Sequence, residues 1–223
     1  MPVERLLDQK DIAELLEQNA APPYGPRNAA LILGGVCWGL TPLELSRITT
    51  ETVLAPGGDF YRIWTIPVDE SFNDEEREIF TEDHLVPFFQ RYVDLRLSRE
   101  WKTTKHKGSF QGLNPKSKFF LNDSGEPYGV IQTKAGYEQA KSVSDQIRRM
   151  INRTKLYGAT PASLRDSYIK MMYEAGCGWK ELMKVSGIKH KRTLENKVRP
   201  HERELEQLIG TIFSRVKMPE SLK

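Results

Sequence analysis

Two clusters of basic residues have the side-chain type and spacing needed to contact nucleic acid phosphates. The first lies between residues 99 and 118, and the second between residues 189 and 203. Glycines and Asn114 in the first segment allow the backbone to approach a phosphate closely. We expect DNA contacts from Lys102, Lys105, Lys107, Lys116, Lys118, Lys189, Lys191 and Arg192. A solvated charged surface is the alternative interpretation.

An acidic segment, residues 69–83, has the opposite character. It contains many carboxylates and a single cation, Arg77, so it would repel a phosphate. Because the net charge of the chain is only +3, composition permits nucleic acid binding without requiring it.

The remaining reactive side chains do not form a metal or cofactor site by their spacing. Cys37 and Cys177 lie inside apolar helical patterns, where buried free thiols are expected. His190 and His201 lie in a basic stretch without the spacing of metal ligands. We therefore expect neither a metal nor a cofactor.

These residues must be positioned by a largely helical scaffold. The 223 residues are 39% hydrophobic, enough for a sizeable core. Thr41-Pro42 is typical of an N-cap followed by the first helical position. Residues 53–54 and 60–68, which flank the turn at 56–59, predict a hairpin. Apolar periodicity predicts helices over 28–38, 43–48, 85–97, 131–151, 164–173 and 205–216. The expected fold class is mainly α with a small antiparallel β-sheet (α+β).

The chain is expected to divide near residue 26. Residues 1–26 form an N-terminal helix and a Pro/Gly-rich hinge, and residues 27–223 form the main body. No apolar run is long enough to span a membrane, and the charged N-terminus lacks a signal-peptide core. These features predict a cytoplasmic protein with no membrane partner.

Three segments carry a recognisable pattern. Residues 30–48 combine an apolar helix, Gly39-Leu40 and a short helix containing Glu-Leu. Residues 160–176 begin with Thr-Pro, contain Leu-Arg and end at a Gly after an alanine. Residues 179–198 join two helices through Gly187. With the strand-like segment 117–129 between them, they resemble the catalytic domain of tyrosine recombinases, the phage-integrase family. The resemblance covers about residues 27–215.

In that family a tyrosine attacks a DNA phosphodiester. Two arginines, a histidine and a hairpin lysine neutralise the developing charge and supply protons. On this resemblance only the second arginine is retained, as Arg165, which is expected either to bind a DNA phosphate or to pair with a carboxylate or a helix end in the interior. The first arginine is replaced by Thr41, the expected histidines by Ala162 and Ile188, and the nucleophile by Glu195. His190 can substitute only in part for the second histidine, and no tyrosine follows Tyr173.

The resemblance implies a catalytically degenerate recombinase that binds DNA. Its expected role is an accessory or regulatory factor of a mobile element or prophage, which occupies a site or joins an active recombinase. An active site-specific recombinase with Tyr168 or Tyr173 as a displaced nucleophile is one alternative, and a protein-interaction scaffold is another. The apolar stripe of residues 202–216 either covers its own core or docks on a second copy or a recombinase partner.

Overall fold

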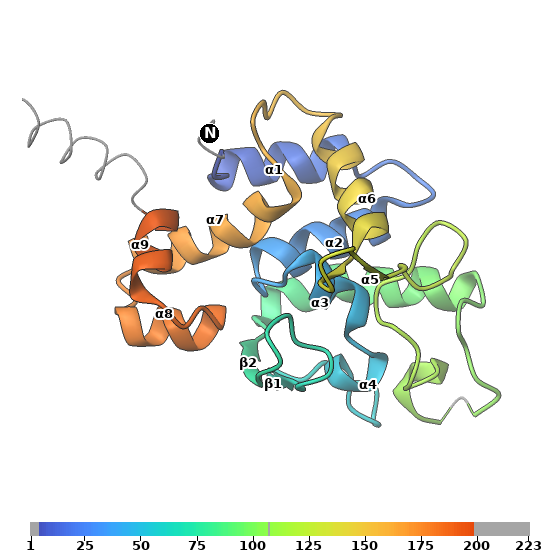
Figure 1. Ribbon diagram of the computed structural model, residues 1–223. Coiled ribbons are helices and arrows are strands. Elements are labelled where there is room, and N and C mark those ends of the chain that lie inside the picture. The colour runs from blue at the N-terminus through green and yellow to red at the C-terminus, as the bar shows by residue number, and fades with distance from the viewer. Residues whose placement is uncertain (1–4, 107, 199–223) are drawn as a thin grey trace, which may run out of the picture.

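The computed structural model describes residues 5–106 and 108–198, and its body is built around one central helix (Figure 1). This helix, α2 (Gly25–Val36), is buried along nearly its whole length. It packs against α1 (Gln9–Gln18), α3 (Pro42–Arg47), α5 (Val86–Ser98), α6 (Lys141–Ile151) and α7 (Pro161–Glu174). Its residues from Ala29 onward are apolar on every side and must be covered on every side, which explains this central position.

Aromatic rings fill the core beside the C-terminal end of α2. The Trp38 ring stacks on Phe89 of α5, with centroids 3.9 Å apart and planes at 5°. Phe119 and Phe120, which directly follow the first basic cluster in the chain, complete this group of rings. The Tyr92 hydroxyl donates to the Phe119 carbonyl at 3.0 Å, so this segment is fixed to α5.

A small antiparallel sheet covers one side of the body. Strands β1 (Ile63–Ile66) and β2 (Arg77–Phe80) pair with Ile63 opposite Phe80 and Ile66 opposite Arg77. Short helix α4 (Thr50–Val53) precedes β1, and 3-10 helix η1 (Asp83–Leu85) links β2 to α5. Another 3-10 turn, η2 (Phe110–Gly112), lies in the first basic loop.

Two helices at the C-terminal end of the described chain form a subsidiary unit. Helices α8 (Trp179–Ser186) and α9 (Lys191–Val198) pack on the second half of α7. Ile169, Leu182, Leu194 and Val198 form a small core that is separate from the main one. Figure 1 shows this unit beside the body, near β2.

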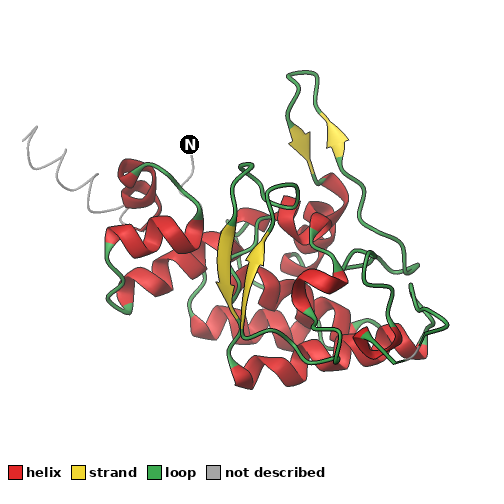
Figure 2. Ribbon diagram, turned by 90° about the horizontal axis from the view of Figure 1, so that it is seen from below, coloured by secondary structure: helices red, strands yellow, loops and turns green. Residues whose placement is uncertain are grey.

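The expected fold class is confirmed: the chain is mainly α with small antiparallel sheets. Two local expectations were wrong. Residues 131–139 form a hairpin, β3 (Ile131–Gln132) with β4 (Glu138–Gln139), and only α6 continues as a helix; Figure 2 shows the hairpin projecting from the body. The partner of β1 is β2, in the acidic segment, whereas residue 54 makes only an isolated bridge to residue 60.

The N-terminal helix is closely packed on the body. Leu15 of α1 is fully buried, and the Asn19 amide donates to the Met150 carbonyl of α6 at 3.1 Å. In the described residues, no helix is long and apolar enough to cross a membrane. The expected helix 205–216 lies outside the described residues.

Candidate functional site

The residue expected in place of the first arginine, Thr41, caps helix α3. Its hydroxyl accepts from the Glu44 amide at 3.1 Å, and the Glu44 carboxylate accepts from the Thr41 amide at 2.7 Å. This reciprocal capping box needs a short hydroxyl side chain at residue 41. Thr41 is therefore a structural residue that ends the loop after Gly39, and it brings the Glu44 carboxylate into the interior.

The Glu44 carboxylate is held by a buried arginine from the sheet. The Arg77 Nη2 donates to Glu44 Oε1 at 2.6 Å, and the exposed fractions of the two side chains are 2% and 0%. Arg77 lies on the same face of β2 as buried Ile79, which directs it toward the core. Its Nη1 donates to the Val185 carbonyl at 2.8 Å and contacts the Gly39 carbonyl at 3.4 Å. One guanidinium thus connects the sheet, α3 and the end of α8.

Arg165, the retained family position, lies on α7 beside this ion pair. Its Nη2 donates to the Ser186 carbonyl, and the Phe72 ring lies over its guanidinium at 4.3 Å from the centroid. Burial lowers the pKa of Arg165 to about 10, a shift that the Glu44 carboxylate opposes and Arg77 increases. Arg165 remains protonated at neutral pH and has no ion pair within the described ranges. Glu44 therefore forms its ion pair with Arg77, and its charge also favours the protonated form of Arg165.

Two buried nitrogens in this cluster lack hydrogen-bond partners. They are the Nε atoms of Arg77 and Arg165, and neither finds an acceptor in the part of the chain that the structure describes. A buried donor without an acceptor is destabilising, so the two guanidiniums are incompletely satisfied.

The loop between β1 and β2 closes over the same cluster. Asn73 donates to the Gly187 carbonyl at 2.9 Å. Glu75 pairs with Lys189 at 2.6 Å, and Glu78 pairs with Lys184 at 2.5 Å. The acidic segment and part of the second basic cluster therefore neutralise each other. We call this set of contacts between residues 72–78 and 184–189 the hairpin latch.

Two glycines allow the close packing of this region. Gly39 has φ of +61°, and a Cβ there would lie 2.5 Å from the Tyr168 ring. Gly187 ends α8 in the left-handed conformation, with Phe72 and Arg77 against it. Glycine is suited to such positions because it has no Cβ.

The other family positions carry no group suited to phosphate chemistry. Ala162 is exposed in the first turn of α7, and Ile188 packs on the small C-terminal core. Glu195 pairs with Lys191 at 3.5 Å on α9. A carboxylate at this position would repel an approaching phosphate.

The two tyrosines considered as displaced nucleophiles are both packed. Burial raises the pKa of Tyr168, whose ring lies against Gly39. The Tyr173 ring stacks on Trp179 with centroids 5.2 Å apart. Desolvation disfavours the phenolate that a nucleophile must form at Tyr168.

The lysines of the first basic cluster are dispersed along an irregular segment. Lys102 pairs with Glu126 and Lys116 with Glu51, both at 2.6 Å, and Lys118 donates to the Arg47 carbonyl at 2.5 Å. Lys105 is exposed without an ion pair to any other described residue. Lys107 lies outside the described residues.

In the second basic cluster, Lys189 belongs to the hairpin latch and Lys191 lies over the Trp179 ring at 5.3 Å. Arg192 is exposed on α9 and has no ion pair within residues 5–106 and 108–198. His190 is exposed too, whereas His201 lies beyond the described range. Residues 5–106 and 108–198 contain no group of three or more side chains placed to hold a metal ion.

Sequence reasoning missed Arg77 and Phe72. Arg77 was noted only as the lone cation of an acidic segment, and Phe72 was not singled out. Alternation within residues 77–80, with Arg77 and Ile79 sharing a face, was the available signal. No local pattern could have placed Phe72 over Arg165, because they are far apart in the sequence.

Comparison with known proteins gives a consistent result at the level of fold. No protein-family model and no curated protein sequence matches the chain. Among solved structures, XerA recombinase matches with a TM-score of 0.64 and 16% identity, over 98% of this chain and 65% of that one. The Tn1549 transposon integrase, in complex with transposon right end DNA, matches at 0.58 and 15%, over 94% and 67%.

XerH site-specific recombinase bound to palindromic difH substrate matches with a TM-score of 0.58 and 16% identity. The match covers 93% of this chain and 53% of XerH, so the chain spans roughly half to two thirds of the proteins it resembles. Helices α2 and α3, helix α7, and helices α8 and α9 carry the three segments that the sequence resemblance had identified. The chain has a tyrosine recombinase-like catalytic-domain fold.

Proposed function

We propose that the protein binds DNA without cutting it, as an accessory or regulatory factor of a mobile element or prophage. The observation that carries this proposal is that the buried arginines Arg77 and Arg165 already bind groups of the protein itself. Arg77 and Arg165 donate to Glu44 and to the carbonyls of Val185 and Ser186, and Phe72 covers Arg165. Groups that would neutralise a phosphate in a recombinase are engaged within the protein.

Strand cleavage requires a nucleophile and preorganised charge stabilisation. Glu195 offers neither at the nucleophile position, and Thr41 and Ala162 offer no charge. The β1–β2 hairpin carries an acidic segment where the family has a lysine, and its one cation, Arg77, is directed inward to Glu44. Loss of the nucleophile alone removes the covalent step, and loss of the remaining groups leaves its transition state uncompensated.

Support for DNA binding comes from the solved structures with this fold and from charge. Integrase and recombinase structures with the same fold are DNA complexes. In this chain, Lys105 and Arg192 are exposed without ion pairs to described residues, and Lys102, Lys116 and Lys191 have partly exposed partners. Phosphates compete with such exposed ion pairs, which are weak in water. Lys118 and Lys189 are expected to contribute less to this surface, because Lys118 donates to the Arg47 carbonyl and Lys189 pairs with Glu75.

The experiment is a salt-dependent DNA-binding measurement by fluorescence anisotropy. The triple variant Lys102→Gln, Lys105→Gln, Lys107→Gln should bind more weakly and show a flatter dependence on salt. Each lost phosphate contact should change the slope of log K against log salt by about 0.9. The matched control neutralises three exposed lysines elsewhere, Lys10, Lys155 and Lys180, and should keep the slope.

The cutting half of the proposal needs a separate assay. A suicide substrate that traps covalent protein–DNA adducts should yield none. An adduct that maps to Tyr168 or Tyr173 would establish the alternative, an active recombinase with a displaced nucleophile. DNA binding that is absent at low salt would overturn the first half of the proposal.

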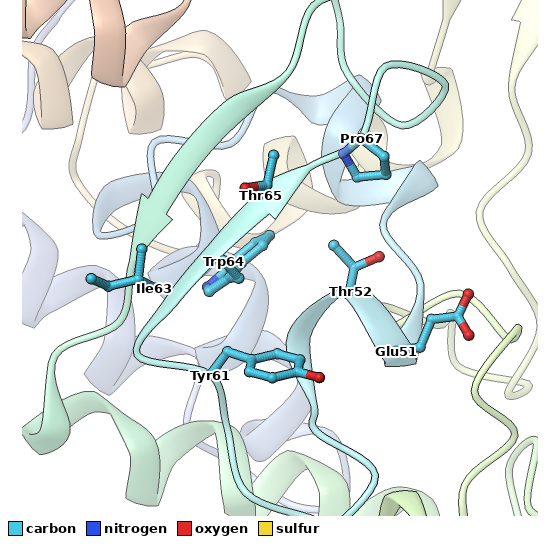
Figure 3. Close-up of a pocket in the computed structure, with 7 residues that line it drawn as sticks. All are labelled: Glu51, Thr52, Tyr61, Ile63, Trp64, Thr65 and Pro67. Carbon is cyan, nitrogen blue, oxygen red and sulfur yellow. The ribbon is translucent and has the colours of Figure 1, made fainter.

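A second candidate function is a protein-interaction scaffold, and the outer face of the small sheet favours it. Ile63 and Phe80 are paired across the strands and are 60% and 50% exposed. Beside β1 lies a hollow of about 340 Å³, to which Glu51 and Thr52 of α4 contribute opposite Tyr61 and Trp64 (Figure 3). Exposed paired apolar side chains are typical of contact surfaces. Substitution of Ile63 and Phe80 by threonine would test whether partner capture, including that of an active recombinase, depends on this face.

Cytoplasmic location and self-association through residues 202–216 belong to the same proposal. They are tested by fractionation and by light scattering of the full chain.

A further inference from the structure

A polar cavity of about 480 Å³ lies at the N-terminal end of α2, far from the arginine cluster described above. It is lined by the loop between α1 and α2, by residue 123 and by one face of α6. Helix α2 lies between the cavity and the region of Gly39. Its twelve residues, which rise 1.5 Å each, make the helix about 18 Å long. The two arginine sites are therefore distinct.

A buried arginine forms the inner wall of this cavity. The Arg27 side chain is only 2% exposed, and its Nε donates to the Asn28 amide oxygen at 3.1 Å. Its Nη1 reaches Asp123 at 2.5 Å and the Tyr128 hydroxyl at 3.3 Å. The Tyr24 ring lies 5.2 Å from its guanidinium carbon. These contacts fix the guanidinium in one position, as bidentate binding of an anion requires.

The Asp123 carboxylate is the one anionic group of the described residues that line the cavity. Its side chain is 56% exposed and lies in a turn, where the Asn122 side chain accepts from the amides of residues 124 and 126. Because more than half of the Asp123 side chain is exposed, water can solvate its carboxylate once another anion replaces it at the buried Arg27 guanidinium. Asp123 occupies the position that the oxygen of an incoming anion would take.

Two further arginines line the mouth of the cavity without a carboxylate partner in residues 5–106 or 108–198. Arg149 donates to the Gln146 amide oxygen at 2.7 Å, and Arg153 donates to the Asn19 amide oxygen at 3.1 Å. Neutral amides orient a guanidinium but leave its charge uncompensated. Three arginines thus face a single carboxylate, and the lining carries a net positive charge.

We propose that this cavity, framed by Arg27, Arg149 and Arg153, binds a phosphate group, either on a free nucleotide or on DNA. Arginines are suited to bidentate recognition of phosphate oxygens. The bound phosphate displaces Asp123 from Arg27 and accepts from all three guanidiniums. The cavity is large enough for more than an inorganic ion, and the Tyr24 ring provides an apolar surface beside it.

The experiment measures binding of inorganic phosphate, AMP and duplex DNA to the full chain by calorimetry and anisotropy. The variant Arg149→Gln, Arg153→Gln should lower affinity for the cognate probe by about tenfold or more, because charge-assisted hydrogen bonds are lost. Arg148→Gln is the matched control: Arg148 is the neighbouring residue of α6, is exposed and pairs with Asp145. It should bind as the unaltered protein does.

The probes separate the two sources of phosphate. If AMP or inorganic phosphate binds and the double variant loses it, the ligand is a free phosphate ester. If only DNA binding falls, a DNA phosphate occupies the cavity. Absence of binding by all three probes, or equal losses in the double variant and in Arg148→Gln, would overturn the proposal.

A second variant tests the displacement of the carboxylate. Asp123→Asn removes the competing charge and should increase affinity for the bound probe several-fold, while a purely structural role for Asp123 would lower it or leave it unchanged. Far-ultraviolet circular dichroism and thermal melting of each variant establish that the fold is intact.

Discussion

Breaking the buried ion pair between Glu44 and Arg77 should strongly destabilise the protein. Glu44→Gln leaves the Arg77 guanidinium buried beside a neutral amide, and the N–O contact of 2.6 Å loses its charge. Removing one partner of a buried pair costs about 3–5 kcal/mol, since the other charge remains desolvated. For a domain of this size, each kcal/mol shifts Tm by about 2–4 °C, so a decrease of about 6–20 °C follows.

The assay is urea denaturation with linear extrapolation, supported by thermal melting. Glu51→Gln is the control, because it breaks the exposed pair with Lys116 by the same chemical change. That variant should keep the urea midpoint of the unaltered protein. Arg77→Met should be as damaging as Glu44→Gln, because it strands the carboxylate.

A double-mutant cycle separates the ion pair from the capping role of Glu44. The combined variant Glu44→Gln, Arg77→Met removes both buried charges, so its loss of stability should be smaller than the sum of the single losses. A coupling of about 0.5–3 kcal/mol is typical of contacting residues. Strict additivity, or a Glu44→Gln variant as stable as Glu51→Gln, would refute the reasoning.

Three further outcomes are expected. Glu195→Tyr should not produce a covalent DNA adduct, since Thr41 and Ala162 still provide no charge; an adduct on the suicide substrate would contradict this. Burial raises the pKa of Cys37 to about 11, so its alkylation at pH 8 should be slow. Because the folded state retains the thiol proton, the free energy of unfolding should fall as pH rises from about 9 to 11. Cys37→Ala should flatten that part of the plot of stability against pH. Glu75→Gln combined with Glu78→Gln should speed proteolysis near residues 184–190, whereas neutralising the exposed pair of Arg62 and Asp83 should not.

Local signals in the sequence predicted local structure well. Thr41, Pro42 and Glu44 form a cap from residues within one turn, so neighbouring residues determine its geometry. Helices α5 and α7 follow from apolar periodicity for the same reason. The hairpin at residues 131–139 was missed because apolar residues at its ends extended the helical pattern across Gly136, which has φ of +82°.

Long-range partners could not be predicted in the same way. Glu75 and Lys189 each belonged to a like-charged segment, and only the packing of α8 on β2 brings them together. The inward orientation of Arg77 depends on which strand pairs with β1, and the many carboxylates around it obscured the alternation. The sequence motif identified Arg165, but the Ser186 carbonyl and the Phe72 ring that contact its guanidinium come from distant segments.

Because the core beneath α8 and α9 is separate from the main core, we expect this part of the protein to unfold as a unit of its own. Ile169, Leu182, Leu194 and Val198 bury far less apolar surface than the main core, so this unit can open at a free energy below that of global unfolding. Two of its contacts with the body, Glu75–Lys189 and Glu78–Lys184, are exposed ion pairs, which added salt weakens more than it weakens the packing of α2. Amide hydrogen exchange should therefore report the opening of α8 and α9 as a sub-global event that becomes more frequent as salt is added.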